Sequence, residues 1–166
     1  CINAFRNGTS WTYGGVTVDF GSVNGGGCTF IAHIHGHEHQ WCFSNGAGYF
    51  DIGENSSFVD LNVLGDATKY GISVWTVDTV NKKIYEDTIA GNAWCYDYLN
   101  GYAEVGVGNW INCAESGLAR PVTCSSSDTS IATCSGRVIT GVSAGTVTIT
   151  VSGNDGNTYN YLVKVV

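Results

Sequence analysis

The residues best suited to chemistry in this 166-residue chain are its four histidines, His33, His35, His37 and His39. Two histidines separated by one residue project to the same face of an extended segment, roughly 7 Å apart. That spacing suits ligands of two neighbouring metals about 3.5–4 Å apart, and it also permits one shared metal if the chain turns at Gly36. Neutral imidazole is a good ligand for zinc, iron or manganese. The stretch therefore predicts a metal site, or part of one.

A metal-bound imidazole needs an acceptor for its other ring nitrogen. Glu38 lies inside the histidine stretch, and Asp51 and Asp60 follow it in the chain. The sequence does not place these carboxylates relative to the histidines. The alternative is that some of the histidines are ordinary loop residues whose hydrogen bonds are satisfied within the protein. No pattern supports a nucleophilic serine or cysteine, so the catalytic residues stay unassigned.

Composition favours a globular protein built from strands and turns. Hydrophobic residues make up 43% of the chain, which holds 23 glycines and one proline, and Thr, Val, Tyr and Ser are frequent. No apolar run approaches the roughly 18 residues of a membrane span. The formal charge of −7 disfavours nucleic acid and anionic membranes as partners. Because the chain starts at Cys1 and has no methionine, we expect it to be the C-terminal part of a longer protein.

Seven cysteines cannot all pair within one chain. They show no Cys-x-x-Cys spacing, which argues against a zinc ribbon. Both a disulfide framework and buried thiols remain open on this evidence. The five tryptophans are expected mainly in the core. Trp94, Tyr96 and Tyr98 could alternatively form an exposed aromatic patch that binds carbohydrate.

The first hundred residues contain segments of alternating polarity separated by Gly- and Asn-rich turns. The strand expected at 28–32 would deliver the histidines to its C-terminal end, and the one at 69–78 has apolar residues on both faces, as a central strand does. The expected elements are a helix end at 1–6, strands at 12–20, 28–32 and 69–78, two short strands within 41–50, a loop at 51–57, a turn at 81–83 and a strand at 84–87.

Beyond Gly101, short strands recur with turns every 8 to 12 residues or so, which is typical of a sandwich. Residues 146–151 alternate cleanly, and residues 154–157 form a strong hairpin signal before the return strand at 159–165. We therefore expect a mainly β fold in two parts, residues 1–100 and 103–166, with a boundary at 99–103.

The second part resembles a bacterial Ig-like domain of group 2. The resemblance runs through Ser-Ile-Ala-Thr at 130–133 and Gly-Arg-Val-Ile-Thr-Gly-Val-Ser-Ala-Gly-Thr at 136–146. Gly141 and Gly145 are expected where strands cross closely. Cys124 and Cys134 depart from the family, which usually has apolar residues there. The resemblance implies a small β-sandwich that acts as a spacer, decoration or adhesion module on cell-surface and phage proteins.

The first part resembles the end of a calcineurin-like metallophosphoesterase of the phage tail-associated type. The residues that carry this are Gly36-His37-Glu38-His39, the family's G-H-x-H, at the end of a short apolar strand, with flanks that fit over residues 1–92. The resemblance implies that His37 and His39 bind a divalent metal, manganese, iron or zinc, with His35 and Glu38 as neighbours. The family's other ligand motifs lie upstream of G-H-x-H and are absent from this chain.

Three functions follow as alternatives. The chain is the C-terminal part of a metal-dependent phosphoesterase, not catalytic as this fragment alone; or a non-catalytic virion structural protein; or a glycan-binding adhesion module. Each predicts a location on a virion, such as a phage tail, or outside the cell at its surface. The expected partners are the missing N-terminal half or other virion or surface subunits, with carbohydrate as an alternative.

Overall fold

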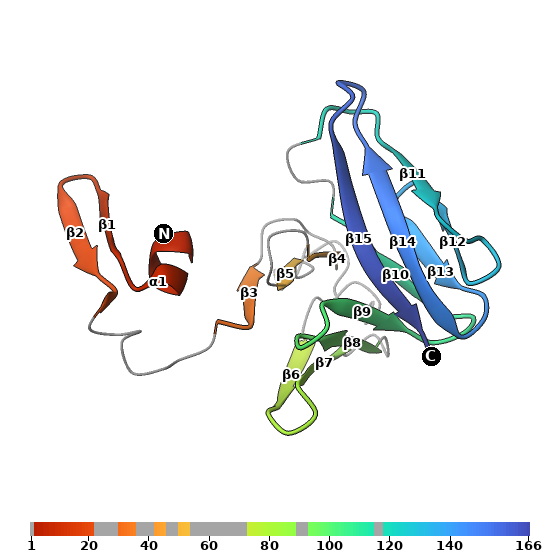
Figure 1. Cartoon of the computed structure of the whole chain (residues 1–166), viewed down its shortest axis with the longest axis horizontal. Helices are drawn as coiled ribbons and strands as arrows, with labels where there is room; N and C mark the ends of the chain where they lie inside the picture. The colour runs from red at the N-terminus through yellow and green to blue at the C-terminus, as the bar shows by residue number, and fades with distance from the viewer. Residues whose placement is uncertain are drawn as a thin grey trace, which may run out of the picture. The chain divides into compact units, whose positions relative to one another are not determined.

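The computed structural model describes residues 2–21, 30–35, 42–45, 50–53, 73–88, 93–114 and 118–166. Contacts divide the chain into two compact units, Cys1–Ile31 and Ala32–Val166. The protein is mainly β, as predicted (Figure 1). Within the described residues, no helix has the length and apolar character that a bilayer crossing requires.

The first unit is a short helix followed by a hairpin. Helix α1 (Ile2–Asn7) confirms the predicted helix end, and Gly8 stops it with a φ of 60°. Strands β1 (Ser10–Tyr13) and β2 (Val16–Asp19) then pair antiparallel. The prediction of one strand over 12–20 was wrong, because Gly14 and Gly15 both take a positive φ and reverse the chain in a two-residue turn.

Seven strands in the described part of the second unit form one sheet, in the order β11-β14-β15-β9-β8-β7-β6. All neighbours are antiparallel except β15 and β9. The strands are β6 (Ser73–Asp78), β7 (Lys83–Thr88), β8 (Ala93–Asp97), β9 (Tyr102–Val105), β11 (Thr123–Ser126), β14 (Gly145–Ser152) and β15 (Thr158–Val165). This confirms the predicted hairpins around 81–83 and 154–157.

Two three-stranded sheets form the opposite layer: β3-β5-β4 and β10-β13-β12. A single parallel bridge between Phe43 and Cys113 joins them, and the Ala114 N–H donates to the Phe43 carbonyl at 2.8 Å. The strands are β3 (Ala32–His35), β4 (Cys42–Ser44), β5 (Phe50–Gly53), β10 (Trp110–Asn112), β12 (Ala132–Ser135) and β13 (Val138–Gly141).

The core lies between the two layers. From the smaller sheets, Phe43 and Phe50 pack on Tyr96 with ring centroids 6.3 and 5.2 Å apart, and Phe43 also packs on Tyr161. The Trp94 ring N–H donates to the Trp110 carbonyl at 2.7 Å. Burial of these large rings supplies the main driving force for stacking the sheets.

Three predicted elements were wrong in detail. The expected loop at 51–57 begins with strand residues, because β5 continues to Gly53. Of the strand expected at 28–32, residues 28 and 29 lie outside the described residues, Phe30 and Ile31 are not in a strand, and β3 begins at Ala32. The strand expected at 69–78 is not central: β6 ends the order of the large sheet in the described part, and its Val74 and Val77 are 62% and 48% exposed.

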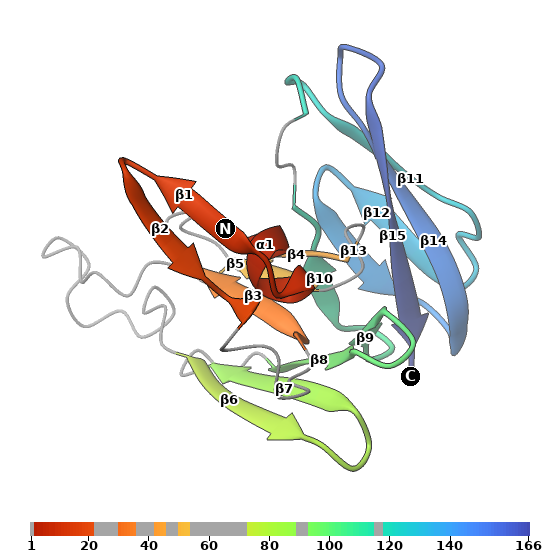
Figure 2. The same cartoon turned by 60° about the vertical axis from the view of Figure 1, so that its left-hand side comes forward.

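The predicted boundary at 99–103 falls in the turn between β8 and β9, two paired strands of the large sheet. Strand β9 also pairs with β15, the last strand of the chain, so residues before and after the boundary share one sheet (Figure 2). A change of domain at that point stays a prediction.

Candidate functional site

Strand β3 carries the first two histidines of the cluster inside the strand, and not beyond its end as predicted. It lies parallel to β5, with His33 opposite Asp51 and His35 opposite Gly53. The His33 side chain is half-buried. The structure describes His35 and Asp51 by their backbone alone.

The residues to which the sequence assigned metal binding follow β3 directly. His37, His39 and their neighbour Glu38 lie outside the described residues, and so does Asp60. Among the side chains that the structure does describe, no three His, Cys, Asp or Glu residues come close enough together to hold a metal ion. The assignment to His37 and His39 therefore stays a prediction.

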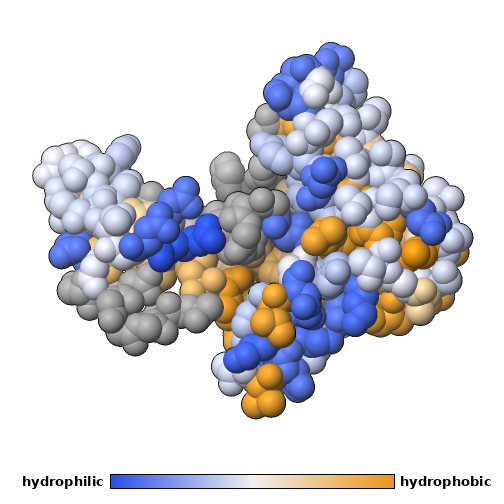
Figure 3. All heavy atoms as spheres, in the orientation of Figure 1, coloured by the Kyte–Doolittle hydropathy of each residue, from blue (hydrophilic) through white to orange (hydrophobic). Residues whose placement is uncertain are grey.

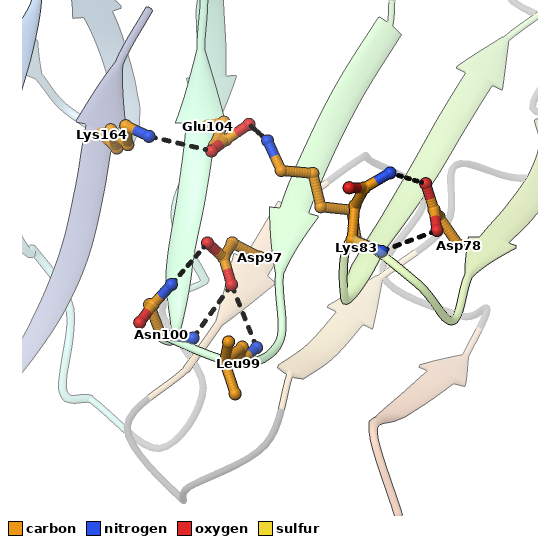
Figure 4. Close-up of polar contacts among 8 residues, drawn as sticks. Asp78, Lys83, Asp97, Leu99, Asn100, Glu104 and Lys164 are labelled. Atoms are coloured by element: carbon orange, nitrogen blue, oxygen red, sulfur yellow. Dashed lines mark hydrogen bonds and ion pairs between the residues drawn. The ribbon is translucent and has the colours of Figure 1, made fainter.

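A polar cluster centres on Glu104 in β9 (Figure 4). Its neighbour Ala103 is paired with Tyr96, which packs on the smaller sheets, so alternation places Glu104 on the opposite face of the large sheet. The Glu104 carboxylate receives a hydrogen bond from Lys83 Nζ at 2.7 Å, and Lys164 Nζ lies 3.5 Å from its other oxygen. The side chain of Glu104 is only 5% exposed. Glu104 thus joins strands β7, β9 and β15 across the outer face of the sheet.

Charges and hydrogen bonds keep this cluster ionised. Burial alone would raise the pKa of Glu104, but hydrogen bonds from Lys83 and Cys95 and the charges of both lysines hold it below its ordinary value. The hydrogen bond to Glu104 raises the pKa of Lys83. Burial, followed by the neighbouring Glu104, raises the pKa of the Cys95 thiol to about 12. Cys95 is consequently a neutral thiol at physiological pH and a poor nucleophile.

Two turns of the same design border the cluster: Asp78 to Asn81 between β6 and β7, and Asp97 to Asn100 between β8 and β9 (Figure 4). In each, the aspartate accepts hydrogen bonds from the backbone N–H groups two and three residues later and from the asparagine side chain. These bonds lower the pKa of Asp78. For Asp97, they outweigh burial and lower its pKa too.

The next residue of each turn, Lys82 or Gly101, takes a positive φ, of 61° and 76° respectively. The Tyr98 N–H donates to the Lys82 carbonyl at 3.0 Å, so the two turns are held side by side. Apolar side chains lie among charged ones on this surface (Figure 3), with Val80 84% and Leu99 69% exposed at the two tips.

Two of the three aromatic residues suggested for carbohydrate serve the core instead. Trp94 and Tyr96 are 4% and 1% exposed, so the expectation of an exposed patch at these two was wrong, whereas Tyr98 is half-buried. The expectation of core packing was right for Trp94 and wrong for Trp110, which is 36% exposed; Trp11 and Trp75 are half-buried. Tyr96 Oη also donates at 3.1 Å to Glu86, a fully buried carboxyl.

One disulfide, between Cys124 in β11 and Cys134 in β12, links the two layers of the sandwich. Cys42 and Cys113 are buried, whereas Cys1 and Cys28 lie outside the described residues. The departures from the Ig-like pattern at 124 and 134 therefore pair with each other.

Sequence reasoning missed Glu104. The sequence shows Glu104 only as a carboxylate in a short strand, at a position that the alternation of strand residues assigns to the solvent-facing side. Nothing local shows that two lysines, 21 residues before it and 60 after it, cover it.

Comparison with models of known families, with curated proteins and with solved structures gave no match.

Proposed function

We propose that this chain is the metal-binding end of a phosphoesterase-like module joined to an Ig-like surface module, on a virion or at the cell surface. The observation that supports the proposal best is the place of β3. This strand lies parallel to β5 and ends at His35, directly before Gly36-His37-Glu38-His39. Carboxyl ends of parallel strands meet at one edge of a sheet, and in α/β folds such edges are where ligands bind.

In this proposal, His37 and His39 hold manganese, iron or zinc through neutral imidazole nitrogens. The metal, when bound, would supply a Lewis acid and an activated water for phosphate-ester hydrolysis. Two histidines are too few ligands for such a centre, so residues upstream of this chain would complete it. The sandwich below would keep β3 in place through its pairing with β5.

Metal content of the purified protein tests the proposal directly. After incubation with each of the three metals and dialysis, the wild type should retain metal, and His37→Ala and His39→Ala should lose it. Thr146→Ala, at an exposed site on β14, is the control and should bind as the wild type does. A wild type without metal, or histidine variants that retain as much metal as the wild type, would sink the proposal.

The hydrolytic part needs a separate assay. With the upstream sequence restored, the protein should hydrolyse a generic aryl phosphate when manganese is added, and His37→Ala should abolish the activity. An extended protein that is inert with all common divalent ions would count against phosphoesterase chemistry while leaving metal binding intact.

A second candidate is a non-catalytic surface or virion protein, with glycan binding as one form of it. The disulfide between Cys124 and Cys134 favours this candidate, because such bonds persist mainly outside the reducing cytosol. This function predicts ordered assembly or glycan binding. Sedimentation as a monomer at all concentrations, together with no retention on immobilised glycans, would contradict it.

A further inference from the structure

The hairpin formed by β1 and β2 has one apolar face and one polar face. Directly opposite residues of an antiparallel pair lie on the same side of the sheet. The register thus gathers four apolar side chains on one face: Trp11, Tyr13, Val16 and Val18. On the other face, the hydroxyl groups of Thr12 and Thr17 form a hydrogen bond of 2.8 Å. The hairpin is therefore amphipathic.

The apolar face of this hairpin is exposed. Tyr13 is 75% exposed, Val16 64% and Val18 38%, and Trp11 is half-buried. Single exposed apolar residues are ordinary on protein surfaces, whereas a patch of them often marks a binding surface. The apolar face of the hairpin is therefore a candidate binding surface of the first unit.

Trp11 and Tyr13 form a parallel ring pair on this face. The interplanar angle is 6° and the ring centroids are 5.7 Å apart. One side of the Tyr13 ring faces Trp11, and the exposure of Tyr13 leaves the other side open to solvent. Aromatic ring faces carry partial negative charge and attract groups with partial positive charge. Polarised C–H groups of that kind cover the faces of a pyranose whose substituents are equatorial.

The polar atoms and charges of the face narrow the class of ligand. Trp11 Nε1 and Tyr13 Oη are donors at the ring edges, and neither forms a hydrogen bond within the described part of the chain. The four side chains are uncharged, so the face suits a neutral ligand. A stable protein interface takes roughly 20–30 residues from each partner, far more than this face offers. A neutral oligosaccharide meets these conditions, because its rings offer C–H faces and its hydroxyl groups accept hydrogen bonds.

We propose that Trp11 and Tyr13 bind a neutral oligosaccharide whose pyranose rings carry equatorial substituents. One pyranose ring stacks on the exposed side of the Tyr13 ring, and Trp11 supports that ring from the other side. Trp11 Nε1 and Tyr13 Oη donate hydrogen bonds to sugar hydroxyl groups. Glycan binding here rests on the second candidate function given above. It belongs to the first unit, since Trp94 and Tyr96 are buried in the core of the second.

NMR titration of the isotope-labelled full chain with cellohexaose and with chitohexaose tests the site. The indole N–H signal that disappears in Trp11→Phe should shift as at least one of these sugars is added. Tyr13→Ala should weaken binding by roughly tenfold, because it removes the exposed ring face. Tyr13→Phe keeps the ring and should bind more tightly than Tyr13→Ala. Ser10→Ala, at an exposed position on the polar face of β1, is the matched control and should leave the affinity unchanged.

The outcomes separate this site from the other proposals. Wild-type affinity in Tyr13→Ala would overturn the site while leaving glycan binding elsewhere on the chain. No shift of the Trp11 signal with either sugar would also overturn it, and metal binding and assembly would be unaffected. A wild type that sediments as a dimer, with Tyr13→Ala as a monomer, would show that a protein occupies the face instead. Amide signals outside the hairpin that keep their wild-type positions would establish that each variant folds.

Discussion

Replacing Glu104 by Gln should destabilise the sandwich by about 2 kcal/mol at neutral pH. The change keeps the shape of the side chain and removes its charge. Lys83, whose Nζ lies 2.7 Å from the carboxylate, then loses its ionised partner and is left with a neutral amide oxygen as acceptor. The ion pairs of Glu104 with Lys83 and Lys164 would no longer link β7, β9 and β15.

The magnitude follows from the geometry of the two ion pairs. At 2.7 Å, Coulomb's law gives roughly 6 kcal/mol with an effective dielectric constant of about 20, and about 1.5 kcal/mol in water. Desolvation of Glu104, which is 5% exposed, offsets much of the larger figure. The Lys164 pair is longer, at 3.5 Å, and 44% of that lysine is exposed, so it adds less than about 0.5 kcal/mol.

The effect should depend on pH in a defined direction. The pKa of Glu104 is lowered in the folded state, so its contribution is complete above the ordinary value of 4.5 and is lost as the pH falls through the lower folded value. The pKa of Lys83 is raised, so its contribution is complete below 10.5 and is lost as the pH rises through the higher folded value. Between these limits the difference between the wild type and Glu104→Gln should be constant.

Urea unfolding followed by tryptophan fluorescence measures the difference, because Trp94 is buried in the folded protein. Lys164→Gln is the matched control and should change stability by less than about 0.5 kcal/mol. Lys83→Gln should cost about as much as Glu104→Gln, and combining the two should cost much less than their sum. Equal stability of the wild type and Glu104→Gln, or a difference that persists unchanged at about pH 2, would refute the reasoning.

Three further changes test other parts of the fold by thermal or urea unfolding. Replacing both Cys124 and Cys134 by Ser should cost about 2–3 kcal/mol, because the bond closes a loop with a sequence separation of 10, and reductant should reproduce the loss in the wild type. Lys82→Gly should stabilise the folded protein by about 1 kcal/mol and Gly101→Ala should destabilise it by a similar amount, because both sites have a positive φ. The two substitutions changing stability in the same direction would contradict this. Gly141→Ala should cost more than about 2 kcal/mol, because its Cβ would lie 2.6 Å from a backbone carbonyl oxygen; unchanged stability would show that the strands can move apart.

Local sequence signals were enough to predict several elements. The turn at 154–157 and the alternation of 146–151 predicted the hairpin of β14 and β15, because turn residues and a period of two act over neighbouring residues only. Gly141 was expected at a close approach of strands, and the carbonyl of Gly106 lies there. These features depend on residues close in the chain or on the small size of glycine.

The remaining features depend on distant partners. The alternation of 12–20 continues in phase across Gly14 and Gly15, so the hairpin looked like one strand. Apolar residues on both faces of β6 indicated a central strand, but strand order is a property of the whole sheet. The pairing of Cys124 with Cys134 could not be chosen among seven cysteines, because many pairings are compatible with one sequence.

The parallel pairing of β15 with β9 has a consequence for synthesis of the protein. It joins residues 103–105 to residues 163–165, so the large sheet cannot close until the end of this chain has left the ribosome. Until then, β9 presents an unpaired edge on the side that β15 later occupies, and such edges invite pairing with other chains. Before Lys164 is in place, Glu104 would put a carboxylate on this unpaired edge of β9. Charged side chains on an exposed edge strand are one way in which proteins discourage pairing with other chains.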